Sequence, residues 1–137
     1  MGNTQSIKKV NFEYIQSELN NNDSFIINTL PIEKQDCLIT GTLTPHRETE
    51  ILNHYLKKNS NIKLIVYAEN SSDQSLSTKC HQLLKLGYTN ILVYPGGLFE
   101  WLLLQDIYGD ELFPTTSACR DHLKYKGRKN ADLMMMR

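Results

Sequence analysis

A short polar segment at residues 68–73 carries the side chains best placed for chemistry. It directly follows residues 62–67 (IKLIVY), the run of the chain most typical of a buried strand. A strand that turns tightly into a helix aims backbone N–H groups and a helix N-terminus at one point, which makes a site for an anion. In an open parallel sheet, ligands bind beyond the carboxyl ends of the strands. The sequence therefore predicts a binding surface made of Ala68, Glu69, Asn70, Ser71, Ser72 and Asp73.

The side chains of this segment limit the chemistry that it can support. Ser71 and Ser72 have no histidine or lysine near them in sequence to act as a base, so solvation of the loop is favoured over a serine nucleophile. Glu69 and Asp73 would repel an anion such as thiosulfate or phosphate. At a separation of about 4–6 Å and an effective dielectric near 20, the repulsion is on the order of a few kcal/mol per charge before screening. Asp73 is expected to cap the helix that follows.

The three cysteines, Cys37, Cys80 and Cys119, are widely spaced and form no CxxC pair. They have no metal-ligand spacing with the four histidines, so neither a metal site nor a cofactor is predicted. Free thiols in a reducing compartment are the simplest interpretation. Cys80 falls on the apolar face of a predicted helix and is expected to be buried and inert. Cys37 lies in a predicted loop, where redox sensing is the alternative to a structural role, and Cys119 belongs to no pattern.

The N-terminus carries a separate signal. Residues 1–9 read MGNTQSIKK, which fits the myristoylation pattern M-G-x-x-x-[ST] with Gly2 as the acceptor and Ser6 at the required place. A chance match is the alternative. A single myristoyl chain binds membranes only marginally, with a partition constant near about 10⁴ M⁻¹. Lys8 and Lys9 would add about 1 kcal/mol each at an anionic leaflet. The sequence therefore predicts reversible attachment to the cytoplasmic face of a membrane.

Composition excludes several classes of function. Fifteen basic residues balance fifteen acidic ones, so the whole molecule has no net charge with which to bind nucleic acid. No apolar run approaches the roughly 20 residues that a membrane-spanning helix requires. The N-terminus lacks the apolar core of a secretory signal, which predicts a cytoplasmic location. A length of 137 residues suits one compact domain.

Apolar runs and helix boundary signals alternate along the chain. Asn11 is a predicted N-cap, Thr44-Pro45 is typical of a helix start, and Gly87 is typical of a helix end. Helices are expected after residues 11 and 44, at 76–86 and at about 98–108, and short apolar runs typical of strands lie at 24–28, 37–39, 62–67 and 91–94. This alternation predicts an α/β fold with a roughly five-stranded, mainly parallel sheet and helices on both faces.

Three parts of the chain are distinguished by their patterning. Residues 1–8 are small and polar and are predicted to be a flexible segment. Residues 9–116 carry the alternating elements and are predicted to form the domain. Residues 117–137 are basic and poorly patterned, and are predicted to be a tail.

Residues 91–101 (ILVYPGGLFEW) resemble the closing motif of the rhodanese family, a strand followed by a Gly-Gly-apolar-x-x-Trp helix start. The motif residues here are Gly96, Gly97, Phe99 and Trp101. Residues 37–43 (CLITGTL) resemble the family's G-H-I-x-G-A segment only in part, since they keep Ile39 and Gly41. Asn28 stands where the family usually has an acidic residue. The likeness covers roughly residues 8–116 and implies a rhodanese-like fold.

The resemblance also implies where the reaction would occur. The family forms a persulfide on a cysteine just after the central strand, and the matching position is Ala68. Alanine offers no nucleophile. We therefore expect a catalytically inactive binding or scaffold module, with a protein partner that the sequence does not identify. The alternative is an enzyme, either a sulphurtransferase that uses another cysteine or a rhodanese-related phosphatase.

Overall fold

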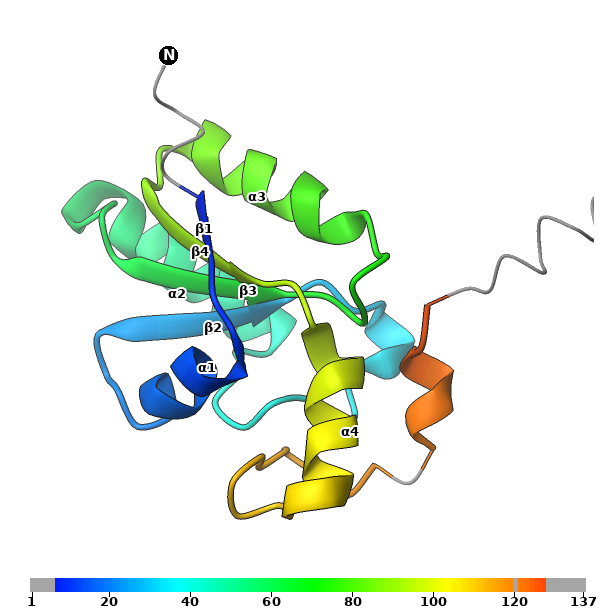
Figure 1. Ribbon diagram of the computed structural model, residues 1–137. Coiled ribbons are helices and arrows are strands. Elements are labelled where there is room, and N and C mark those ends of the chain that lie inside the picture. The colour runs from blue at the N-terminus through cyan, green and yellow to red at the C-terminus, as the bar shows by residue number, and fades with distance from the viewer. Residues whose placement is uncertain (1–6, 120, 128–137) are drawn as a thin grey trace, which may run out of the picture.

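The computed structural model describes residues 7–119 and 121–127. Within these residues one sheet contains β1 (Ile7–Lys9), β2 (Ser24–Asn28), β3 (Lys63–Tyr67) and β4 (Asn90–Tyr94). The strand order is β1-β4-β3-β2, and every neighbouring pair is parallel. All carboxyl ends therefore lie at the same edge of the sheet (Figure 1).

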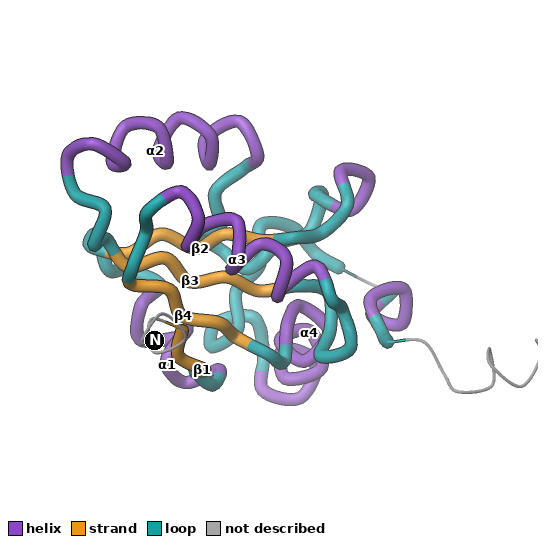
Figure 2. The backbone as a smooth tube through the Cα atoms, turned by 90° about the horizontal axis from the view of Figure 1, so that it is seen from above, coloured by secondary structure: helices purple, strands orange, loops and turns teal. Residues whose placement is uncertain are grey.

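The inner strands are apolar because helices cover the sheet on both sides. Figure 2 shows α2 (Pro45–Lys58) and α3 (Ser75–Leu86) on one face, and α1 (Phe12–Glu18) and α4 (Gly97–Tyr108) on the other. Alternate strand residues feed two cores: Ile65 faces the α1/α4 side, whereas Leu64 and Val66 face the α2/α3 side. This layered arrangement confirms the predicted α/β fold.

Local capping residues define the ends of three helices as predicted. The Asn11 side chain accepts a hydrogen bond from the Tyr14 N–H at 3.1 Å, which begins α1. Thr44 caps α2 directly ahead of Pro45. Gly87 ends α3 with a φ of +116°, a left-handed conformation that favours glycine. No helix in the described part of the chain is long and apolar enough to cross a membrane.

The sheet differs from the prediction at two places. Four strands are found in the described residues, and the expected strand at 37–39 makes only one isolated bridge, between Ile39 and Thr115. The reason is that the Ile39 N–H donates to the Tyr67 hydroxyl at 3.1 Å instead of to a neighbouring strand. At the other edge, β1 pairs with β4 from Ile7 onward, so the sheet begins inside the segment expected to be flexible.

The C-terminal segment also differs from the prediction of a tail. The 3-10 helix η3 (His122–Tyr125) lies against the domain, and the Tyr125 side chain is completely buried in the core on the α1/α4 side. The burial of Tyr125 was not predicted because it is a single aromatic residue among basic neighbours. The folded unit therefore extends at least to residue 127.

Trp101 is the largest fully buried side chain in α4. Its ring packs edge-on against Tyr94 and Phe113, and its Nε1–H donates to the Pro114 carbonyl at 3.1 Å. We expect Trp101→Ala to lower the free energy of unfolding by about 3–5 kcal/mol, because the cavity cannot be refilled. Chemical denaturation measures this. The control is Leu103→Ala, because Leu103 lies on the same helix and is 41% exposed. We expect that variant to change the free energy of unfolding by no more than about 0.5 kcal/mol. Equal losses in the two variants would contradict the assigned packing.

Candidate functional site

The candidate site is the loop that joins β3 to α3 at the carboxyl edge of the sheet. Ala68 is the first residue after β3 and is 1% exposed. Ser71 and Ser72 are exposed at the tip of the loop, and Ser75 begins α3. The strand-loop-helix turn predicted from the sequence is therefore present.

The start of α4 holds this loop by its backbone. The Leu98 N–H donates to the Ala68 carbonyl at 3.0 Å, and the Phe99 N–H donates to the Glu69 carbonyl at 2.8 Å. Gly97 makes the contact possible, because a Cβ at this position would lie 2.6 Å from the Ala68 oxygen. Its φ of +72° is a conformation that other residues rarely adopt. The glycine motif thus positions the loop.

Polar side chains inside the loop bind the loop's own backbone. Asn70 Oδ1 accepts from the Ser72 N–H at 2.9 Å, and Asp73 Oδ1 accepts from the Ser75 N–H at 2.9 Å. Asp73 therefore satisfies the first N–H group of α3, although the residue at the N-cap position itself is Gln74. One N–H group that could have faced an anion is already occupied by a carboxylate.

Glu69 does not act as the free charge that the sequence suggested. Its carboxylate pairs with Lys34 Nζ at 2.5 Å, with 15% of the glutamate side chain and 28% of the lysine side chain exposed. The lysine comes from the 3-10 helix η2 (Ile32–Lys34), which packs beside the loop. The pair reduces the repulsion expected at the mouth of the loop, so Asp73 is the main source of that repulsion. No local pattern could have revealed a partner 35 residues away.

The C-terminal strap, defined here as residues 121–127, lies directly on the loop. Asn70 Nδ2 donates to the Tyr125 carbonyl at 2.9 Å, and Lys34 Nζ donates to the Lys124 carbonyl at 3.2 Å. The Lys34 ammonium also lies 5.8 Å from the centre of the Tyr125 ring. The strap therefore covers the loop at Asn70, while Ser71 and Ser72 at its tip stay exposed.

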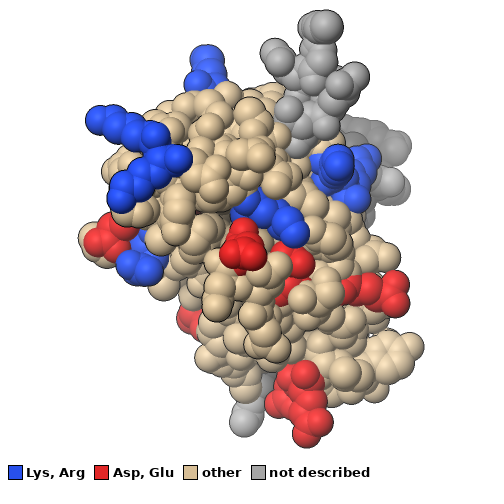
Figure 3. Space-filling view, turned by 90° about the vertical axis from the view of Figure 1, so that its left-hand side faces the viewer, with Lys and Arg blue, Asp and Glu red and all other residues tan. Residues whose placement is uncertain are grey.

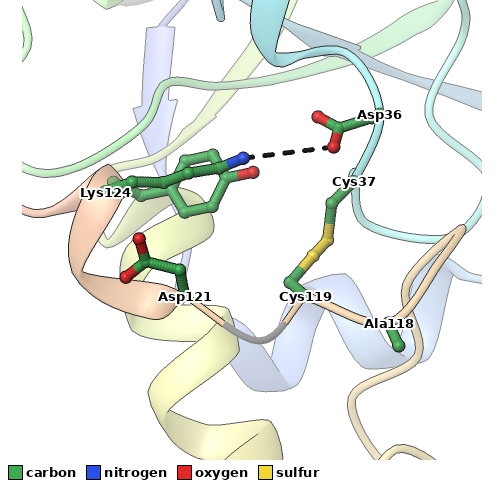
Figure 4. Close-up of a pocket in the computed structure, with 7 residues that line it drawn as sticks. Asp36, Cys37, Ala118, Cys119, Asp121 and Lys124 are labelled. Carbon is green, nitrogen blue, oxygen red and sulfur yellow. Dashed lines mark ion pairs between the residues drawn. A yellow bond between two sulfur atoms is a disulfide. The ribbon is translucent and has the colours of Figure 1, made fainter.

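The cysteines are placed differently from the expectation of free thiols. Cys37 and Cys119 form a disulfide with a Cα–Cα distance of 6.1 Å (Figure 4). Cys80 is free and buried as predicted, and burial raises the pKa of its thiol to about 11. The described residues thus offer no exposed thiol that could replace the missing nucleophile.

The remaining predicted residues divide between packing and regions outside the structure. Phe99 packs against the core. Asn28 Oδ1 accepts from the Leu30 N–H at 2.9 Å and from Gln35 Nε2 at 2.8 Å, so this side chain stabilises the turn after β2. Gly2 lies outside the described residues. No group of three potential metal ligands occurs among the residues that the structure describes.

A family model described as the rhodanese-like domain matches residues 13–104, about two thirds of the chain. The chain belongs to the rhodanese-like domain family. No curated protein sequence matches it. The 68–73 loop, Gly97 and Trp101 all lie within the matched residues.

Solved structures share the rhodanese-like fold at low sequence identity. The Saccharomyces cerevisiae protein Ygr203w, described as a homolog of single-domain rhodanese and of the Cdc25 phosphatase catalytic domain, is 15% identical with a TM-score of 0.60, covering 84% of this chain and 90% of that one. The yeast single-domain sulfurtransferase RDL2 is 20% identical with a TM-score of 0.56, covering 78% and 95%. The rhodanese-like domain of Anabaena Alr3790 is 17% identical with a TM-score of 0.55, covering 82% and 87%.

The cost of a side chain at Gly97 can be compared with the cost of one at Gly87, a second glycine of positive φ. We expect Gly97→Ala to lower the free energy of unfolding by at least about 2 kcal/mol, since it combines backbone strain with a clash against the Ala68 carbonyl. Gly87→Ala is the matched control, because its Cβ would make only an ordinary contact of 3.7 Å with Leu56. That variant bears the strain alone, at about 1 kcal/mol. Equal losses in denaturant titrations would show that the close approach has no cost.

Proposed function

We propose that this protein is a catalytically inactive rhodanese-like module that binds a protein partner through the 68–73 loop. The observation that carries the proposal is Ala68, which occupies the position just after the central strand where the resemblance places the sulphur-accepting cysteine. Its methyl group is buried and has no lone pair to attack sulphur or phosphorus. The carboxylate of Asp73 on the Ser75 N–H further disfavours an anionic substrate.

The enzymatic alternatives both need a thiolate in this loop. Neither Cys37 nor Cys119 belongs to the loop, and the two are joined to each other. Cys80 is buried in the core on the α2/α3 side with a raised pKa, so its thiol stays protonated at neutral pH. Ser71 and Ser72 have hydroxyls in the loop, but among residues 7–119 and 121–127 no side chain within hydrogen-bond distance acts as their base. These contacts support a binding role over sulphur or phosphoryl transfer.

Activity assays test the absence of catalysis. We expect no thiosulfate:cyanide sulphurtransferase turnover and no aryl phosphatase turnover above buffer for the wild-type protein. Ala68→Cys combined with Asp73→Arg is the matched gain-of-function variant, and we expect it to gain one sulphur atom by intact mass after treatment with thiosulfate. Cys80→Ser leaves the loop unchanged and serves as the control. Wild-type turnover above buffer would overturn the proposal, and its loss or survival in Cys80→Ser would show whether Cys80 is the nucleophile.

The proposed module is held at a membrane by a myristoyl group on Gly2. The topology supports a defined orientation for this attachment. Gly2 lies five residues before Ile7, where β1 begins, and an extended chain of five residues reaches roughly 17 Å. The loop follows the carboxyl end of β3. Both β3 and β1 run parallel to β4, so the loop and the start of β1 lie at opposite edges of the sheet. An acyl chain would thus enter the bilayer near the amino edge of the sheet, with the loop directed away from it.

Basic side chains at the amino edge would assist this attachment. Helices α2 and α3 end there, and their last turns carry the exposed residues Lys57, Lys58 and Lys85. Figure 3 views the molecule from the left-hand side of Figure 1, and most Lys and Arg side chains on this face lie in its upper part, with acidic side chains in its middle and lower parts. Each lysine near an anionic leaflet adds about 1 kcal/mol, which is the second contribution that one myristoyl chain needs.

Co-expression with an N-myristoyltransferase tests the membrane proposal. We expect the mass of one myristoyl group on the wild-type protein and none on Gly2→Ala. The acylated protein should sediment with vesicles containing phosphatidylserine, and Lys57→Glu/Lys58→Glu should weaken binding by about tenfold or more. Equal binding of acylated wild type and Gly2→Ala, or no acylation at all, would contradict the proposal.

A further inference from the structure

The strap is attached to the domain differently from the chain that precedes it. Residues 109–117 are held by hydrogen bonds to the domain: the Thr40 N–H donates to the Pro114 carbonyl at 3.1 Å, and the Thr116 N–H donates to the Leu38 carbonyl at 2.8 Å. Ser117 Oγ adds a hydrogen bond to the Asp36 carbonyl at 2.7 Å. This part of the chain therefore stays in place without the strap.

In the described residues beyond Ser117 the attachments to the domain are few. They are the disulfide to Cys37, the two hydrogen bonds from Asn70 and Lys34 to strap carbonyls, an exposed pair of Lys124 with Asp36 at 4.0 Å, the packing of η3 against α4, and the buried ring of Tyr125. A segment held by so few contacts opens without global unfolding unless it is cross-linked. The disulfide fixes the strap two residues before it begins.

The strap contacts the loop as a bound peptide would. Two of its backbone carbonyls accept hydrogen bonds from side chains of the site, and one aromatic ring fills an apolar space in the core that also contains Tyr67 and Leu98. The Lys34 ammonium faces that ring at 5.8 Å. These are the features of a site for an extended peptide with one aromatic anchor.

The disulfide is accessible to a reductant. It forms one wall of an open hollow of about 180 Å³, lined also by Asp36, Asp121 and Lys124 (Figure 4). Cys37 is buried, whereas Cys119 is partly exposed, so an incoming thiolate meets Cys119 Sγ first.

We propose that the strap is an intramolecular ligand of the 68–73 loop, latched by the Cys37–Cys119 disulfide, and that reduction releases it to expose a site for a peptide with an aromatic side chain between basic residues. The partner class follows from the strap itself, in which Tyr125 lies between Lys124 and Lys126. The inference rests on the proposed function only in taking the loop as the binding surface.

The reductant is a dithiol, and the exchange balances. One thiolate of the dithiol attacks Cys119 Sγ, the Cys37–Cys119 bond breaks, and Cys37 leaves as a thiolate. The second thiolate of the dithiol then attacks the mixed disulfide and releases Cys119. The dithiol is oxidised to a cyclic disulfide, the protein disulfide is reduced by two electrons, and the two protons of the dithiol end on Cys37 and Cys119.

Hydrogen exchange with and without dithiothreitol tests the latch. Thiol alkylation first verifies each state: unfolded oxidised protein should take up one label, at Cys80, and unfolded reduced protein three. On reduction we expect exchange of strap amides and of amides in the 68–73 loop to rise by about tenfold or more, while amides of β3 and β4 stay protected. Cys119→Ser should match the reduced protein and should not respond to dithiothreitol. Unchanged exchange in verified reduced protein would overturn the latch.

A peptide of the strap sequence, DHLKYKG, tests the exposed site by fluorescence anisotropy. We expect saturable binding to reduced wild type and to reduced Tyr125→Ala, no binding to oxidised wild type, and loss of binding when the peptide's tyrosine is replaced by alanine. Peptide binding that is equal for oxidised and reduced protein, or absent from both open forms, would overturn the site. These readouts do not depend on catalysis, so a wild-type protein active in sulphur transfer would refute the proposed function and leave this test unaffected.

Discussion

The structure depends on the close approach of two backbones, where the first residues of the 68–73 loop meet the first turn of α4. A side chain at Gly97 would occupy the same space as the Ala68 carbonyl, and the next two amides of α4 bind Ala68 and Glu69. This contact fixes the end of β3 against the helix that follows β4. Trp101, one turn further along α4, anchors the same helix through the Pro114 carbonyl. The site is thus built from backbone geometry, which the loss of a nucleophile leaves intact.

The same geometry explains how a family site can change its role. With alanine at position 68, the side chains of the loop are engaged in contacts within the protein: Asn70 holds the strap, Glu69 pairs with Lys34, and Asp73 binds the start of α3. These contacts occupy the polar side chains of the loop within the protein. A surface that holds a peptide segment of its own chain has the features required to hold one from another protein.

The sequence predicted those features that depend on local order. Apolar periodicity and capping residues located α1 to α4 and the inner strands, and with them the loop at 68–73 between β3 and α3. The features it missed join distant residues. The Glu69–Lys34 pair spans 35 positions and the disulfide spans 82, and neither leaves a pattern in its neighbourhood. Tyr125 is one aromatic residue among basic ones, and β1 has only three residues, which is too short for a periodicity to be detected.

The central claim is that this rhodanese-like loop does not accept an anion. The most direct measurement is a titration of the oxidised, isotope-labelled protein with thiosulfate, monitored by the amide chemical shifts of residues 69–75 at constant ionic strength. The account requires shifts no larger than those produced by chloride, with no saturation at millimolar concentrations. Saturable shifts confined to the loop and the first turn of α3 would contradict it, since they would show that the 68–73 loop binds a substrate anion although it has no cysteine.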